Sequence, residues 1–150
     1  TAWTSWVAVS ESGDNSDGLI IADHECNEYY TAKRYNALAH FSKFVPVGSK
    51  VISNEKDVND RVAWKIKNQM GFVILNKTNC ASFLTPDGSI VVVIVNDDAG
   101  CTFNFEGISG RDNLKIYTTN DQYDLKLTYD GEYKQEVEIP GLSITTLIFS

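Results

Sequence analysis

Basic residues are scarce in this 150-residue chain. Its 13 Lys and Arg residues stand against 20 Asp and Glu residues, and the formal net charge at pH 7 is −7. Because nucleic-acid binding is driven by Lys and Arg contacts with phosphates, this balance excludes nucleic acid as an expected partner. The acidic composition suits an acidic compartment, and an ordinary acidic soluble protein is an equally good interpretation.

Long apolar runs are also absent. The longest run covers residues 90–95, whereas a membrane-spanning helix needs about 20 apolar residues. No basic leader followed by an apolar core opens the chain, so no signal peptide is recognisable. We therefore expect no transmembrane segment, and we interpret the opening residues as the interior of a folded domain.

Cysteine and histidine are both rare. Cys26, Cys80 and Cys101 cannot all pair within the chain, and none forms a CxxC motif. A Cys80–Cys101 disulfide would require their strands to lie side by side, and we favour buried thiols. His24 has no second histidine at HExxH spacing, so no metal site is predicted. His40 lies next to the apolar stripe of a predicted helix, and we interpret it as structural rather than catalytic.

One segment has helical periodicity. Between residues 31 and 45, apolar side chains recur at spacings of three and four. This stripe consists of Tyr35, Leu38, Phe41 and Val45, widened by Ala39 and Phe44. Thr31 is the expected N-cap, and Pro46 with Gly48 is expected to end the helix. Two strands, at residues 3–10 and 19–22, are expected before it, with a polar loop between them.

Short strands separated by turns are expected from residue 50 onward. The candidate strands are residues 50–53, 61–66, 71–75, 81–84, 89–96, 102–106, 114–119, 123–129, 132–139 and 143–149. Thr85-Pro-Asp-Gly88 predicts a hairpin turn, and Asp130-Gly131 predicts a second one. Residues 91–95 are apolar at every position, which predicts a central strand covered on both faces. The pattern is typical of an antiparallel β-sandwich.

A domain boundary is expected near residue 48. Residues 1–48 would form a βα unit, and residues 49–150 would form the β-sandwich. The βα unit is too small to bury its own helix, so we expect that on its own it is either adhesive or docked on the sandwich. A unit of this kind is typical of the end of a larger (β/α)8 barrel. The predicted fold is therefore mainly β, with a terminal βα unit in front of the sandwich.

Four motifs resemble glycoside hydrolase family 30, which includes the glucosylceramidases. They occur in the family's order at residues 18–23, 35–49, 86–96 and 140–147, and the second reads Tyr35-Asn-Ala-Leu-Ala-His-Phe-Ser-Lys-Phe-Val-Pro-Val-Gly-Ser49. The resemblance covers only the family's C-terminal part. It implies that the two catalytic glutamates would precede Thr1, so that this chain is a non-catalytic fragment.

By this resemblance, the intact protein would be a retaining β-glycosidase, most specifically a glucosylceramidase that releases glucose from ceramide. It would need no metal ion or organic cofactor, and it would be lysosomal or secreted. The expected partners are the remainder of the barrel and a glycosphingolipid or other β-glycoside substrate. A different family 30 specificity, such as xylanase or β-1,6-glucanase, remains an alternative.

Two residues are candidates for substrate binding. Trp6 resembles the family tryptophan on the final barrel strand, where a flat aromatic face suits a pyranose ring; an indole packed in the core is the competing interpretation. The resemblance also implies a polar loop residue near Asp14 or Asn15, although this loop departs from the family in length and composition. We interpret the acids Glu11, Asp14 and Asp17 as parts of a solvated turn.

Two further alternatives belong to other functional classes. The chain could be a stand-alone carbohydrate-binding β-sandwich that uses exposed tyrosines as a stacking platform, or a structural or adhesive domain. The fragment hypothesis makes its own structural prediction. It requires at least one unpaired sheet edge and an exposed apolar face on the helix.

Overall fold

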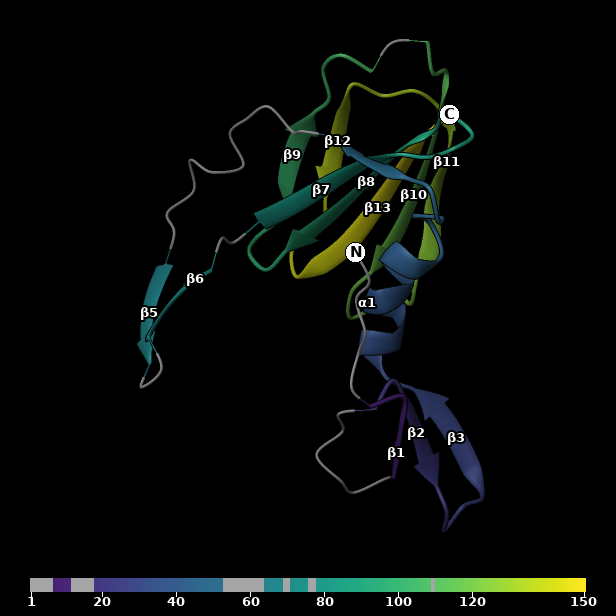
Figure 1. Ribbon diagram of the computed structural model, residues 1–150, viewed down its shortest axis with the longest axis vertical. Coiled ribbons are helices and arrows are strands. Elements are labelled where there is room, and N and C mark those ends of the chain that lie inside the picture. Colours follow the sequence, from purple (N-terminus) through teal and green to yellow (C-terminus); the bar gives the residue numbers. More distant parts are fainter. Residues whose placement is uncertain (1–6, 12–17, 53–63, 69–70, 76–77, 109) are drawn as a thin grey trace.

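The computed structural model describes residues 7–11, 18–52, 64–68, 71–75, 78–108 and 110–150. Its main element is a six-stranded antiparallel sheet with the strand order β11-β10-β13-β8-β7-β4 (Figure 1). In chain order these strands are β4 (Lys50–Ile52), β7 (Thr78–Leu84), β8 (Ile90–Asn96), β10 (Asn113–Thr119), β11 (Lys126–Glu132) and β13 (Ser143–Phe149).

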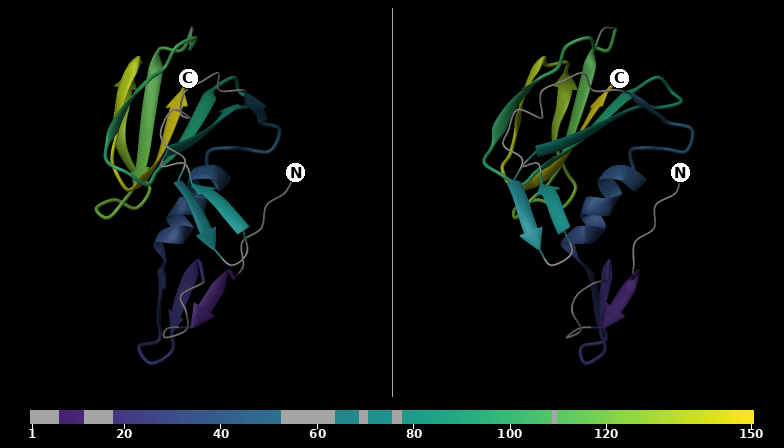
Figure 2. Two further views of the ribbon diagram at one scale, coloured as in Figure 1. Left: turned by 90° about the vertical axis from the view of Figure 1, so that its left-hand side faces the viewer. Right: turned by 60° about the vertical axis from the view of Figure 1, so that its left-hand side comes forward.

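A two-stranded layer covers one face of this sheet. Strands β9 (Cys101–Asn104) and β12 (Glu136–Ile139) pair with each other in antiparallel fashion. The core between the layers consists of Val92, Ile94, Leu114, Ile116, Val137, Ile139, Leu147 and Phe149. Figure 2 shows the two layers facing each other. The predicted antiparallel β-sandwich is therefore confirmed.

Strand β8 lies inside the sheet, between β13 and β7. Val92 and Ile94 belong to the sandwich core, and alternation along the strand places Val91 and Val93 on the opposite face, where they are also buried. This confirms the predicted central strand for residues 91–94. Val95 differs, because 37% of its surface is exposed.

The hairpin predicted at Thr85 is present. The amide of Gly88 donates to the Thr85 carbonyl at 3.0 Å, and the amide of Thr85 donates to the Ser89 carbonyl at 2.9 Å. Gly88 takes the positive φ of +88° that such a turn requires. The turn therefore joins β7 directly to β8.

The second predicted turn, at Asp130-Gly131, is wrong. Both residues lie inside β11, where Lys115 pairs with Asp130 and Leu114 pairs with Gly131. The hydroxyl of Tyr129 donates to the Glu132 carbonyl at 2.9 Å, which holds its ring over Gly131. The ring covers the glycine as a side chain of its own would, so the strand continues through it.

A second sheet contains the N-terminal strands β1 (Val9–Glu11), β2 (Ile20–Asp23) and β3 (Glu28–Thr31). Strand β1 pairs with β2 in parallel, and β2 pairs with β3 in antiparallel fashion. Strand β3 was not expected from the sequence. The turn before it is closed by Asp23, whose Oδ1 accepts the amides of Glu25 and Cys26. A further hairpin consists of β5 (Trp64–Asn68) and β6 (Gly71–Leu75).

Helix α1 (Lys33–Ser42) begins later than predicted, because Thr31 belongs to β3 and Ala32 occupies the N-cap position. It lies against the face of the six-stranded sheet opposite to β9 and β12 (Figures 1 and 2). The helix therefore docks on the sandwich, as expected. Among the described residues, no helix is long and apolar enough to cross a membrane.

The three cysteines are thiols in this structure, as favoured from the sequence. Cys80 and Cys101 are half-buried against the sandwich core, from β7 and β9 respectively. Burial raises the pKa of the Cys80 thiol. Cys26 is exposed, so the expectation that all three are buried is wrong for this residue.

Candidate functional site

The two predicted substrate-binding residues, Trp6 and Asn15, lie outside the described residues, as do Asp14 and Asp17. Glu11 is described and is exposed, with its carboxylate 3.6 Å from the ring of His24. Within the described ranges, no three His, Cys, Asp or Glu side chains come together as metal ligands. The candidate site must therefore be built from the elements that adjoin Trp6.

Strand β1 continues the chain from Trp6, and its main chain is held by the start of β2. The amide of Leu19 donates to the Val7 carbonyl at 3.1 Å, and the amide of Ile20 donates to the Ala8 carbonyl at 3.0 Å. The amide of Gly18 donates to Ser10 Oγ at 3.2 Å. A Cβ on Gly18 would lie 2.5 Å from that oxygen, so only glycine fits this approach.

The helix that follows is fixed to the sandwich by a buried histidine. Nδ1 of His40 lies 2.7 Å from the hydroxyl of Thr146 on β13, and Nε2 lies 2.9 Å from the hydroxyl of Thr119 on β10. His40 is fully buried, and burial lowers the pKa of its imidazole to about 4. Neutral at pH 7, it joins one helix to two strands, which confirms the structural interpretation.

Aromatic contacts flank this histidine. The ring centroids of Phe44 and Tyr117 are 4.4 Å apart, and those of Phe41 and Phe83 are 6.4 Å apart with perpendicular planes. The helix face that contacts the sandwich therefore includes His40, which the predicted apolar stripe left out.

A third attachment lies at the start of α1. Lys33 Nζ donates to Asp124 Oδ1 at 2.7 Å and to the Asn120 carbonyl at 2.8 Å. Asn36 Nδ2 donates to the same Asp124 oxygen at 3.1 Å. These residues connect the helix with the loop between β10 and β11. Sequence reasoning missed this contact, because 91 residues separate Lys33 from Asp124 and no local pattern links them.

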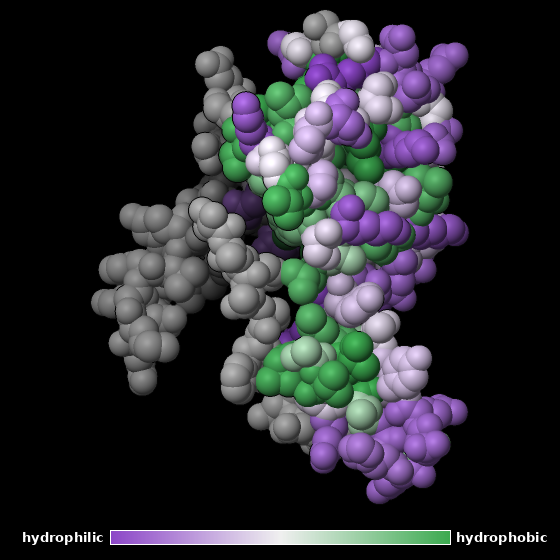
Figure 3. Space-filling model, turned by 45° about the vertical axis from the view of Figure 1, so that its right-hand side comes forward, coloured by the Kyte–Doolittle hydropathy of each residue, from purple (hydrophilic) through white to green (hydrophobic). Residues whose placement is uncertain are grey.

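The N-terminal sheet presents apolar side chains to the surface. By strand pairing and alternation, one face of it, which we call the outer face of the β1–β3 sheet, carries Val9, Ile20, Ala22 and Tyr29 together with the polar Glu11 and Thr31. Val9 is 54% exposed and Tyr29 is 77% exposed. Figure 3 shows apolar residues gathered near the junction of this sheet with α1.

The fragment hypothesis predicts an exposed apolar face on the helix, but the exposed apolar side chains lie mainly on the β1–β3 sheet. On α1, Tyr35 from the predicted stripe is exposed. The predicted unpaired edges are also present among the described strands, at β4 and β11. Every open sheet has edges, so this agreement discriminates little.

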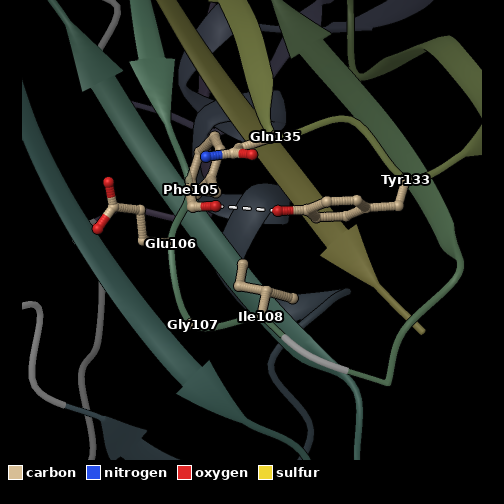
Figure 4. Close-up of a pocket in the computed structure, with 6 residues that line it drawn as sticks. All are labelled: Phe105, Glu106, Gly107, Ile108, Tyr133 and Gln135. Atoms are coloured by element: carbon tan, nitrogen blue, oxygen red, sulfur yellow. Dashed lines mark hydrogen bonds between the residues drawn. The ribbon is translucent and has the colours of Figure 1, made fainter.

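The sandwich also has a shallow recess of about 250 Å³, beside the segments that follow β9 and precede β12. It is lined by Phe105, Glu106, Gly107, Ile108, Tyr133 and Gln135 (Figure 4). The hydroxyl of Tyr133 points across it and donates to the Phe105 carbonyl at 2.9 Å. Tyr133 also packs against the buried Phe149. Its ring is therefore part of the core packing rather than a free stacking platform.

Comparison with known proteins gives a consistent assignment. Residues 47–147 match the family model described as the glycosyl hydrolase family 30 beta sandwich domain. Lysosomal acid glucosylceramidase from Mus musculus is 30% identical over 106 residues, which cover 64% of this chain and 17% of the mouse protein. The chain thus spans only a small part of this relative.

Solved structures share the fold at lower identity. The catalytic domain of GH30 xylanase C from Talaromyces cellulolyticus matches with a TM-score of 0.69 and 18% identity, over 97% of this chain and 30% of that chain. A conserved exported protein from Bacteroides fragilis matches with a TM-score of 0.65 and 19% identity, over 94% of this chain and 28% of that chain. Because the family model spans residues 47–147, the chain belongs to glycoside hydrolase family 30 and contains the β-sandwich domain of that family.

Proposed function

We propose that this chain is the C-terminal part of a retaining β-glycosidase of the glucosylceramidase type, in which it supports the catalytic barrel and is not itself catalytic. The observation that carries this proposal is the 30% identity to a glucosylceramidase over 106 residues. In the described residues, α1 and the six-stranded sheet are joined by buried and charged contacts, which suits a supporting role.

The two parts of the chain would have different tasks. Residues 1–48 would complete the barrel, and residues 49–150 would form the sandwich beside it. Trp6 would line the sugar pocket as a flat apolar wall for a pyranose ring, with Asn15 as a second contact from the following loop. The outer face of the β1–β3 sheet would then be covered by the remainder of the barrel.

The proposed reaction is the hydrolysis of glucosylceramide to glucose and ceramide, in a lysosomal or secreted enzyme. Retaining glycosidases use two carboxylates roughly 5 Å apart, one as nucleophile and one as acid/base. Both would come from the barrel. The similarity to a lysosomal glucosylceramidase supports this substrate. The fold shared with xylanase C supports the wider family, whose substrates include other β-linked sugars.

The test is an activity assay on the full natural polypeptide that contains this chain. We expect it to release glucose from glucosylceramide with retention at the anomeric carbon, and we expect the 150-residue chain alone to release none. A Trp6→Ala variant of the full polypeptide should raise KM, because the pocket wall is lost. Cleavage of xylan or β-1,6-glucan but not of glucosylceramide would contradict the proposed substrate, while the assignment to the family would stand.

The carbohydrate-binding alternative has less support. The four tyrosines of the sandwich, Tyr117, Tyr123, Tyr129 and Tyr133, are all half-buried. The exposed ones are Tyr29 and Tyr30 on β3 and Tyr35 on α1. Saturable binding of a β-glucan by the isolated chain, abolished by substitution of a sandwich tyrosine, would revive this alternative.

A further inference from the structure

A lysine at the start of α1 is held by a single loop of the sandwich. The Lys33 ammonium group has three donors, and it meets three oxygens of residues 120–124. These are Asp124 Oδ1 at 2.7 Å, the Asn120 carbonyl at 2.8 Å and the Tyr123 carbonyl at 3.5 Å. An exposed ion pair alone contributes little. This contact also fixes the position of the Lys33 ammonium group relative to the loop, because two of its acceptors are main-chain carbonyls.

The loop has its own internal support. Asn120 Oδ1 accepts the amides of Gln122 and Tyr123, each at 2.9 Å, and the Asn120 amide donates to the Tyr123 carbonyl at 3.0 Å. The Leu125 amide donates to Thr119 Oγ1, which also contacts His40. The main-chain acceptors for Lys33 are therefore arranged largely by hydrogen bonds within the loop itself.

Hydrogen bonds lead from Lys33 back to strand β1. The amide of Ala32, the residue before Lys33, donates to the Leu19 carbonyl at 2.9 Å. The amides of Leu19 and Ile20 donate in turn to the carbonyls of Val7 and Ala8. Val7 directly follows Trp6 in the chain. A continuous set of contacts thus joins the sandwich loop to the main chain beside the proposed pocket residue.

We propose that Lys33, Asn36 and Asp124 are positioning residues, through which the sandwich fixes strand β1 for the glycosidase reaction. This inference rests on the proposed function. The three side chains touch no substrate; they set the start of α1, and through Ala32 and Leu19 they set the register and position of β1. They give the sandwich a specific role in catalysis beyond that of a passive support.

The first experiment measures kinetics of the full polypeptide with Lys33→Met, Asp124→Asn and Lys33→Arg. The structure offers a matched control in Lys115 and Asp130, an exposed pair at 3.5 Å on β10 and β11. Side-chain exposures are 54% and 59% in the Lys33 pair and 45% and 51% in the control pair.

Misplacement of a substrate-positioning group can cost up to about 100-fold in rate, and for this more distant contact we expect KM to rise roughly threefold to tenfold at nearly constant kcat. Lys33→Arg should keep KM close to the wild-type value, and Lys115→Met should leave KM unchanged. Equal kinetics in Lys33→Met and Lys115→Met would overturn the proposal. So would a loss of activity that only follows the fraction of folded protein.

A second measurement separates this inference from the proposed function. Amide hydrogen exchange at Leu19 and Ile20 reports the hydrogen bonds to β1 directly, whatever the substrate. We expect Lys33→Met to accelerate exchange at both amides, and Lys115→Met to leave it unchanged. If the wild-type polypeptide hydrolyses no glycoside, the proposed function fails, and exchange alone then decides the positioning role. Unchanged exchange at both amides in Lys33→Met would refute it.

Discussion

His40 combines a titratable ring with complete burial. Its two nitrogens contact the hydroxyls of Thr146 and Thr119, and each of these can donate or accept. A neutral imidazole, with one donor and one acceptor, is therefore satisfied whichever tautomer it adopts. The protonated ring would carry a charge into a site without a described carboxylate partner, which is why burial lowers its pKa to about 4.

This environment predicts a pH dependence of stability. The pKa of His40 is about 4 in the folded chain, against about 6.5 for an unfolded histidine. Below pH ~6.5 the unfolded state binds the proton first, so stability is fully present above that pH and falls towards pH 4, by up to roughly 3 kcal/mol. Urea unfolding at several pH values measures the loss.

The control for this prediction is His40→Gln, which keeps a hydrogen-bonding side chain and has no charge to gain. Its free energy of unfolding at pH 7 should be lower, because the fit to both threonines is poorer. Between pH 6.5 and 4 its stability should change less than that of the wild type. Parallel curves for the two proteins would show that carboxylates, and not His40, cause the acid sensitivity.

At the scale of elements, the parallel pair β1–β2 depends on a close approach at Gly18. A Cβ there would lie 2.5 Å from Ser10 Oγ and 2.7 Å from the Ser10 amide nitrogen. Because one of these atoms is main chain, the clash cannot be relieved by a rotamer change. We expect Gly18→Ala to destabilise the pair by about 1–3 kcal/mol, measured by amide exchange along β2.

Gly100 supplies the matched control for this substitution. A Cβ at Gly100 would meet the Ile139 carbonyl at 3.4 Å, an ordinary contact, and its φ is not positive. Gly100→Ala should therefore change the stability by less than about 0.5 kcal/mol. Equal effects at the two glycines would mean that the approach at Gly18 is not as tight as the structure shows.

The elements also show which sequence signals carry information about structure. The central strand β8 and the turn at Thr85 follow from local chemistry, since an all-apolar run and a Pro-Asp-Gly turn each have one dominant outcome. Asp130-Gly131 misled because the ring of Tyr129, held by its hydroxyl, covers the glycine and lets the strand continue. The buried face of α1 was predicted incorrectly, because the most deeply buried residue of the helix is the polar His40 and the apolar stripe left it out.

At the scale of the whole molecule, the family motifs identified the fold, and the contacts between distant segments were beyond prediction. The ion pair of Lys33 with Asp124 and the hydrogen bond of His40 with Thr146 depend on how the helix packs on the sheet. Neither carries a local pattern. Trp6 and Asn15 stay predictions, because they lie outside the described residues.

The outer face of the β1–β3 sheet leads to a prediction for the molecule as a whole. Val9 and Tyr29 expose most of their surface there, and exposed apolar patches bind apolar ligands or partners. We expect the isolated chain to enhance the fluorescence of an apolar dye, and a Val9→Lys, Tyr29→Lys double variant to reduce this. Val51→Lys, at an exposed valine on β4, is the control. Equal reductions in both variants would place the dye elsewhere.

Strand β13 lies between β10 and β8, although it follows every other strand of the six-stranded sheet in the chain. The six-stranded sheet therefore cannot close until residues 143–149 have been synthesised, even though domains commonly begin to fold during translation. Until then, β10 and β8 have facing edges with unpaired amides and carbonyls. A nonsense mutation shortly before Ser143 would leave those edges open permanently, so its product would be suited to aggregation and degradation rather than to forming a smaller folded domain.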